Sequence, residues 1–193
     1  SRLVGAYALY EADLQDANVA GIELSVTGGT FTGNTYSENV TEFISGGTFS
    51  TSVEETYLAD GMMLHEVNGG YTVATIVATI SRGGETLNFA SVQDAIDVAQ
   101  DEEVIKILNY SVVTEDIVVA SGKNITINLL SQVTLSGTFV NNGTVAIDIS
   151  AGASSRYQPS VFDAVITNNE GATLSIDINF ASLGSRMRYA ELR

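Results

Sequence analysis

Residues 145–149 read VAIDI, and the same alternation recurs at 125–129 (ITINL) and at 174–178 (LSIDI). Strict alternation of aliphatic and polar residues has the period of a β-strand that buries one face. Three such segments in the second half of the chain favour a structure built from repeated short strands.

The spacing of these segments is regular. Ile107, Ile127 and Ile147 lie 20 residues apart, and Ile176 follows after 29, across an insert at 151–159 that contains the only proline. A repeat of about 20 residues with short strands and polar corners is typical of one turn of a β-solenoid. We therefore predict a mainly β protein, a right-handed parallel β-solenoid (β-helix) with short flanking helices, in which these isoleucines stack as a ladder. A β-sandwich, with turn signals about every 8–12 residues, is the alternative.

Glycine and asparagine pairs mark the expected corners of this repeat. The phrase GGTF occurs at 28–31 and again at 46–49. Glycine and asparagine adopt left-handed backbone conformations at less cost than other residues, which suits tight corners. Under this interpretation the phrase repeats because a backbone turn repeats. The predicted corner residues are Gly28, Gly29, Gly46, Gly47, Asn141, Asn142, Asn168 and Asn169.

The chain divides into three predicted segments. Residues 1–18 are expected to form a capping or docking helix, residues 19–81 a first β segment with the GGTF repeats, and residues 82–193 the solenoid with a basic C-terminal tail. Apolar residues at spacings of three and four predict the helix. Those residues are Leu3, Tyr7, Tyr10 and Leu14.

Two local signals are also clear. Asn68-Gly69-Gly70 predicts the turn of a β-hairpin. Ser91 is a suitable N-cap for an amphipathic helix that begins at Val92, and Asp94 places negative charge in its first turn. A strand is expected to follow at 104–108.

Charge and composition limit the classes of partner. Lysine and arginine number 8 against 23 acidic residues, which gives a net charge of −15. Such a surface repels phosphate backbones and anionic membranes, so we expect no nucleic acid partner. No apolar run is long enough to span a membrane, and the absence of cysteine excludes disulfides and thiolate metal sites. The N-terminal Ser1-Arg2-Leu3 suggests a processed or excised chain.

Two longer phrases carry a resemblance to a known family. Residues 88–129, from NFASVQDAIDVAQ to GKNITINL, resemble the opening of parallel β-helix (pectate-lyase-like) segments in secreted bacterial surface proteins. Residues 44–73, from ISGGTF to NGGYTV, are similar to a phrase that closes such segments. Related phrases occur in phage fibre and decoration proteins. The resemblance implies a β-helical architecture and a location at a bacterial cell surface or virion surface.

The same resemblance requires an enzymatic alternative to be considered, because some proteins of this wider fold cleave acidic polysaccharides. Lys106 is the basic residue that alternates with strand residues, and Asp148 and Asp177 occupy equivalent positions with Asn128 one repeat earlier. We interpret all four as outward-facing polar positions. His65 is the single histidine, and we interpret it as a strand residue. We predict no catalytic residue, no metal site and no cofactor.

These observations favour a non-catalytic, extracellular structural or adhesive protein that presents a surface for attachment. A phage head-fibre or capsid decoration protein is the alternative, and a polysaccharide lyase or hydrolase fragment is less favoured. The expected partners are further copies of the chain or a larger assembly, and a host surface glycan or protein. The residues predicted to contribute to assembly are Arg186, Arg188, Arg193, Tyr7, Tyr10 and Leu14.

Overall fold

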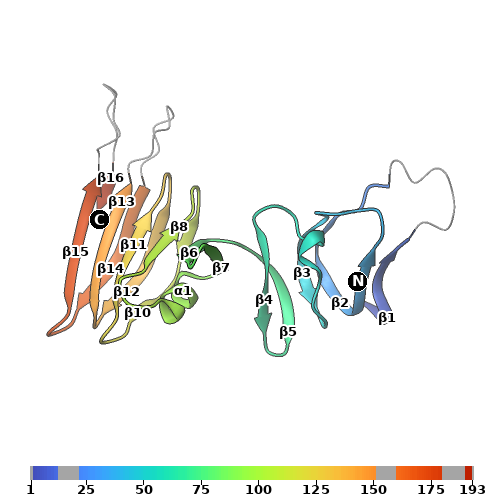
Figure 1. Cartoon of the computed structure of the whole chain (residues 1–193), viewed down its shortest axis with the longest axis horizontal. Helices are drawn as coiled ribbons and strands as arrows, with labels where there is room; N and C mark the ends of the chain where they lie inside the picture. The colour runs from blue at the N-terminus through green and yellow to red at the C-terminus, as the bar shows by residue number, and fades with distance from the viewer. Residues whose placement is uncertain (1, 13–21, 151–159, 180–189, 193) are drawn as a thin grey trace, which may run out of the picture. The chain divides into compact units, whose positions relative to one another are not determined.

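The computed structural model describes residues 2–12, 22–150, 160–179 and 190–192. The chain forms two compact units, Ser1–Thr75 (unit 1) and Ile76–Arg193 (unit 2). Strands dominate both units, and the described residues contain one short α-helix, so the predicted mainly β class is confirmed (Figure 1). The segment boundary predicted between residues 81 and 82 differs from the boundary between the units, which lies between residues 75 and 76. Residues 81 and 82 belong to the first hairpin of unit 2.

Unit 1 contains a five-stranded sheet in the order β1-β2-β3-β5-β4. Strands β1, β2 and β3 pair in parallel, whereas β5 pairs antiparallel with both β3 and β4. The predicted hairpin turn joins β4 to β5, with Asn68 and Gly69 at φ of 52° and 78°. The elements are β1 (Arg2–Glu11), β2 (Val26–Ser37), β3 (Ile44–Phe49), a 3₁₀ turn (Glu55–Tyr57), β4 (Met62–Val67) and β5 (Gly70–Thr75).

The two GGTF phrases lie on neighbouring parallel strands, β2 and β3. Phe31 is paired with Phe49, and their rings stack with centroids 4.8 Å apart and 10° between the planes. The glycine pairs lie within these strands, at shifts of the pairing register, and not between strands as the corner prediction had it. Gly47 has a φ of 115°, and a Cβ on Gly46 would lie 2.5 Å from the carbonyl oxygen of Thr27. Left-handed conformation and close backbone approach therefore both require glycine here.

The predicted N-terminal helix is wrong for residues 2–11, which form the strand β1. This strand pairs with β2 along its length, and the register shifts twice, between Val4 and Tyr7 and between Tyr7 and Leu9. Each shift leaves an extra residue on β1, as in a β-bulge. The extra residue between Tyr7 and Tyr10 places both side chains on the same face of the strand although they are three residues apart in the sequence. A spacing of three is typical of a helix, which explains why the sequence pattern predicted one. Leu14 lies outside the described residues.

Unit 2 contains two sheets, and from β10 to β16 successive strands belong to one and the other in alternation (Figure 1). One has the order β15-β13-β11-β8-β6-β7, and the other has the order β10-β12-β14-β16 with β9 also paired to β12. The bounds are β6 (Ala78–Arg82), β7 (Glu85–Phe89), β8 (Val104–Ile107), β9 (Val112–Thr114), β10 (Ile117–Val119), β11 (Asn124–Leu129), β12 (Thr134–Asn141), β13 (Thr144–Ser150), β14 (Ser160–Asn168), β15 (Thr173–Asn179) and β16 (Ala190–Leu192).

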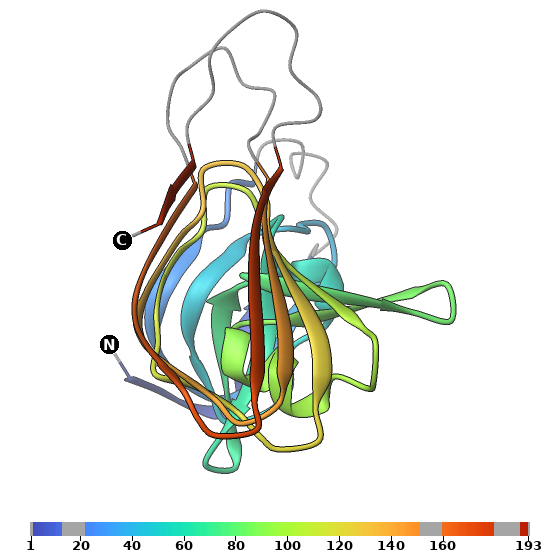
Figure 2. The ribbon, with the colours of Figure 1, turned by 90° about the vertical axis from the view of Figure 1, so that its left-hand side faces the viewer.

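Among the described residues, every pair formed between two of the strands β8 to β16 is parallel. Each strand lies beside the strand of its own sheet that precedes it by one repeat, and Figure 2 shows the later strands lying over the earlier ones. In the part of unit 2 that the structure describes, antiparallel pairing involves β6, which pairs with β7 and β8. This parallel arrangement differs from the antiparallel β-sandwich considered as the alternative.

The isoleucine ladder is present, with one correction to its register. Ile127 lies opposite Ile147, and Ile147 lies opposite Ile176, as predicted. Ile107, however, lies opposite Leu129, and the partner of Ile127 is Ile105. The first repeat thus spans 22 residues where the sequence suggested 20. Ile105, Ile107, Ile127 and Ile147 are fully buried in the core between the two sheets.

The helix α1 (Val92–Val98) covers the β6–β10 end of this core. Its predicted N-cap is confirmed, because the Ser91 hydroxyl accepts a hydrogen bond from the Asp94 backbone N–H. The Glu115 carboxylate adds a second cap, which the sequence did not reveal, by accepting from the backbone N–H groups of Val92 (3.1 Å) and Gln93 (3.0 Å). Helix and sheets are therefore joined by polar contacts at the helix N-terminus and by apolar packing along its inner face.

Asparagine side chains join the connection between β12 and β13 to the connection between β14 and β15, at the positions predicted as corners. Asn141 is fully buried; it donates to Asn168 Oδ1 (2.8 Å) and to the Thr173 carbonyl oxygen (2.9 Å), and it accepts from Gly143 N–H (2.9 Å). One residue further along each of the same two connections, Asn169 donates to Asn142 Oδ1. None of these asparagines has a positive φ. Their side-chain amides, not left-handed backbones, are what these corners require.

Candidate functional site

The residues considered for enzyme chemistry lie in one row across the six-stranded sheet. Lys106, Asn128, Asp148 and Asp177 are register partners on β8, β11, β13 and β15. They alternate with fully or partly buried isoleucines and leucines, and Lys106 and Asp177 are exposed, so the row faces away from the core. His65 lies on β4 opposite Thr72. Within the described ranges, no three His, Asp or Glu side chains come together in a group that could hold a metal ion.

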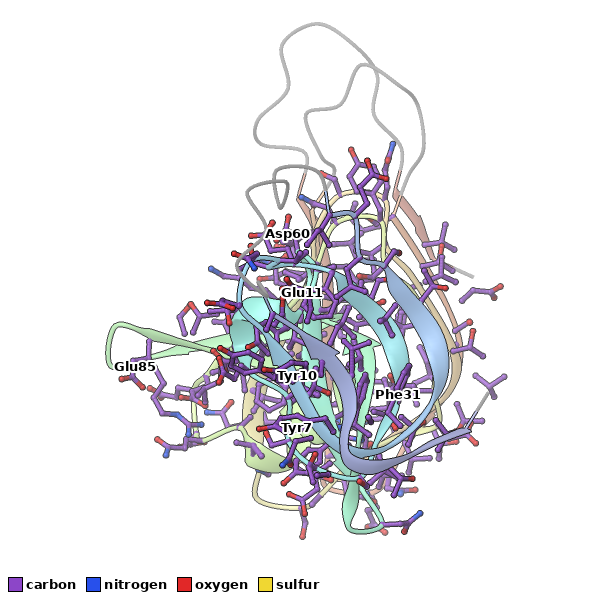
Figure 3. All side chains as sticks on the ribbon, turned by 90° about the vertical axis from the view of Figure 1, so that its right-hand side faces the viewer. Tyr7, Tyr10, Glu11, Phe31, Asp60 and Glu85 are labelled. Atoms are coloured by element: carbon purple, nitrogen blue, oxygen red, sulfur yellow. The ribbon has the colours of Figure 1, made fainter. Side chains whose placement is uncertain are left out.

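Unit 1 presents a different feature, a cluster of exposed aromatic rings. Tyr7 and Tyr10 on β1 are 51% and 58% exposed, and Tyr36 on β2 is 38% exposed. The rings of Tyr10 and Tyr36 stack with centroids 5.4 Å apart and 23° between the planes, and Tyr7 meets Tyr10 edge-on at 5.1 Å. We call these three residues the tyrosine surface. Figure 3 shows Tyr7 and Tyr10 along β1, with Glu11 beside them.

Strand pairing and the bulge in β1 create this surface. Tyr10 and Tyr36 are register partners on adjacent parallel strands, which places equivalent side chains about 4.8 Å apart along the sheet. Tyr7 joins them because the extra residue between Tyr7 and Leu9 brings residues 7 and 10 to the same face. Ala8, within the bulge, is buried. All three rings therefore stand on paired strands and not on a loop.

Hydrogen bonds to the Glu11 carboxylate fix the chain immediately after Tyr36. The Glu11 carboxylate accepts from Ser37 Oγ (2.8 Å), from the backbone N–H groups of Glu38 (3.1 Å) and Asn39 (2.9 Å), and from Asn39 Nδ2 (2.9 Å). The hydrogen bonds from Asn39, foremost that of its side chain, hold the pKa of Glu11 at about 2. Glu11 is consequently ionised at neutral pH and acts as a structural acceptor, not as an acid or base.

Tyr57 holds Ser37 from the interior of unit 1. Its hydroxyl accepts from the Ser37 backbone N–H (3.1 Å) and donates to the Ser37 carbonyl oxygen (2.9 Å), and its ring packs against Phe43. Ser37 is thus held by Glu11 on one side and by Tyr57 on the other. Partial burial, followed by the negative charge of Glu38, raises the pKa of the Tyr36 phenol, which keeps it protonated. The Tyr36 phenol is therefore neutral, and Ser37, the residue after it, is held by hydrogen bonds on both sides.

Sequence reasoning found part of this site. It singled out Tyr7 and Tyr10 as residues of a docking face that contributes to assembly, and the structure brings them together on β1, although not on a helix. It missed Tyr36 and Glu11, because only the register of β1 on β2 reveals their proximity to Tyr10 and to residues 37–39. The other predicted assembly residues lie outside the described residues; these are Leu14, Arg186, Arg188 and Arg193.

Comparison with known proteins adds no assignment. The chain matches no protein-family model, no curated protein and no solved structure. No helix in the described residues is both long and apolar enough to cross a membrane.

Proposed function

We propose that this protein is a non-catalytic, extracellular structural or adhesive protein, that unit 2 is a parallel β-solenoid, and that the molecule presents a surface for attachment at a bacterial cell or virion. The observation that carries the proposal is the in-register parallel stacking of β8, β11, β13 and β15, with the second sheet stacked in the same sense. In such an array each turn rests on its neighbour, which gives a stiff scaffold.

The chemistry of the outer faces supports a scaffold more than a catalyst. Outward positions of the stacked strands hold mainly small polar side chains such as Thr126, Ser136 and Thr138. Thr114 and Ser136 hydrogen-bond across strands, and Asp116 accepts from Thr138, so several of these groups are engaged with one another. The tyrosine surface adds a cluster of exposed aromatic rings that contact one another, which is a kind of surface used for binding.

Two experiments test this proposal. An antibody raised against unit 2 should label the outside of intact cells or virions that carry this sequence, and label confined to the cell interior would contradict the extracellular function. Incubation of the protein with acidic and neutral polysaccharides should release neither reducing ends nor unsaturated sugars. Release that is abolished by Asp148→Asn or Asp177→Asn, but retained by Asp163→Asn on the other sheet, would show a catalyst instead.

A further inference from the structure

We propose that the tyrosine surface is a binding site for a neutral saccharide, with Tyr10 as its central contact. The inference deepens the proposed attachment function and rests on it. Tyr10 is the most exposed of the three rings at 58%, and it touches both of the others. Strand β1 forms the edge of its sheet, with no strand beyond it among the described residues, so a ligand can approach this side.

The chemistry of the cluster matches that of a sugar ring. A pyranose ring carries apolar C–H groups on its faces and hydroxyl groups around its rim. A tyrosine carries a flat apolar ring and a phenol that both donates and accepts hydrogen bonds. Three adjacent tyrosines therefore offer an apolar contact with polar groups at its margin, which is the composition typical of small-molecule sites.

Charge selects among saccharides. The chain carries a net charge of −15, and the ionised Glu11 and the nearby Glu38 lie beside the tyrosines. Uronic acids, sialic acids and sulfated sugars would be repelled by these carboxylates. A neutral glycan meets no such penalty. The four hydrogen bonds to Glu11 also leave its oxygens committed to the protein, so recognition falls to the tyrosines.

The size of the surface favours a small ligand over a second copy of the chain. A tyrosine buries roughly 150–250 Å² when it is fully covered, so three rings that are about half exposed offer roughly 300 Å². A stable protein–protein interface needs about 800 Å² from each partner. The tyrosine surface is too small for that purpose and large enough for one or two sugar rings.

The backbone that carries the tyrosine surface is held in place by its neighbours. Tyrosine loses little conformational entropy on binding, and fixing its backbone beforehand lowers the cost of binding further. Here the bulge orients Tyr7 and Tyr10, while Glu11 and Tyr57 fix Ser37, the residue after Tyr36. These contacts hold exposed rings that contribute little to the core of unit 1, which is the arrangement a binding site requires.

The test is saturation-transfer NMR of the full chain with neutral tetrasaccharides (cellotetraose, maltotetraose and lacto-N-tetraose) and with tetragalacturonate as the acidic probe. We expect transfer to at least one neutral probe and weaker or no transfer to the acidic one. Tyr10→Ala should weaken binding about tenfold or more, and Tyr10→Phe, which keeps the ring, should lose less. Tyr110→Ala is the matched control, because Tyr110 is 71% exposed in unit 2. Tyr7→Ala provides a second variant if Tyr10→Ala does not fold.

The outcomes separate this inference from its alternatives. Absence of transfer to every neutral probe, equal loss in Tyr10→Ala and Tyr110→Ala, or preference for tetragalacturonate would each overturn it. A wild-type dimer that Tyr10→Ala converts to monomer, without sugar binding, would identify the surface as a contact between copies and overturn it as well. If sugar binding fails while antibody still labels the outer surface, the attachment function stands and this site alone is wrong.

Discussion

Ile127 lies directly opposite Ile147 on the neighbouring parallel strand, and both side chains are completely shielded from solvent. Ile105 and Ile176 extend the contact to the strands on either side. The side chains of four successive repeats therefore pack as one column, and the stability of unit 2 depends on every member of it.

Ile127→Asp should unfold unit 2, because it buries a charge that has no partner in this column. Ile127→Ala should lower the free energy of unfolding by about 2–5 kcal/mol. The control is Thr126→Asp, one residue away on the outward side of β11, which should fold. Circular dichroism with thermal melting measures all three. An Ile127→Asp protein that melts like the wild type would refute the stacked core.

The repeated GGTF phrase provides a matched pair of glycines. Gly46→Ala should destabilise unit 1 by about 1–3 kcal/mol, because its Cβ would lie 2.5 Å from the Thr27 carbonyl oxygen. Gly28→Ala places its Cβ in open space and should be neutral or slightly stabilising. Thermal unfolding, with hydrogen–deuterium exchange of peptides from β2 and β3, distinguishes the two variants. Equal effects of both would show that the strands do not approach as described.

Asn141 is expected to be the most sensitive of the corner asparagines. Asn141→Ala removes three hydrogen bonds and leaves the Gly143 N–H and the Thr173 carbonyl without their side-chain partner, at a cost of about 2–4 kcal/mol. Asn169→Ala, which removes one exposed hydrogen bond to Asn142, should cost less than about 1 kcal/mol. Urea unfolding gives both values, and a larger loss for Asn169→Ala would contradict the assignment of the buried amide.

Acid should weaken unit 2 through Glu103. This carboxylate accepts from Arg82 Nε and Nη2, both at 2.7 Å, and from the Gln100 backbone N–H at 2.8 Å. The hydrogen bonds from Arg82, and then the one from Gln100, lower the pKa of Glu103 from 4.5 to about 2. Because the folded-state pKa is depressed, the stabilisation is complete above pH 4.5 and is lost as the pH falls towards 2.

Glu103→Gln should therefore reduce stability at pH 7 by on the order of 1 kcal/mol, and the difference from wild type should shrink towards pH 2. Glu102→Gln, at the adjacent exposed position, is the control and should change little. Melting temperatures of the three proteins between pH 2 and pH 7 provide the measurement. A difference between Glu103→Gln and wild type that stays constant across this range would contradict the described ion pair.

The sequence predicts the strands of unit 2 well, because every second residue is buried in VAIDI and partly buried in LSIDI, and hydrophobic alternation is a local property. It predicts pairing less well. The partner of Ile127 in the preceding repeat is Ile105 and not Ile107, since the length of the connection, and not the side-chain pattern, sets the register. The pairing with Ile147 is predicted correctly because that connection keeps the 20-residue spacing.

The tyrosine surface shows a second limit. Tyr7 and Tyr10 are recognisable as residues that share one face, but their spacing of three suggests a helix until the bulge in β1 is known. Tyr36 carries no local signal at all, because its proximity to Tyr10 depends on a strand register set elsewhere. The four donors around Glu11 likewise come from residues 37–39, which approach only after β1 has paired with β2.

The order of strand pairing in unit 2 has a consequence for biosynthesis. From β11 onward, every described strand pairs with a strand that precedes it in the chain: β11 with β8, β13 with β11, and β14 with β12. A ribosome synthesises the chain from its N-terminus at about 5–20 residues per second. Each strand would therefore emerge after the strand with which it pairs has already been synthesised. The α1 end can therefore serve as a nucleus on which later repeats are laid down in the order of their synthesis.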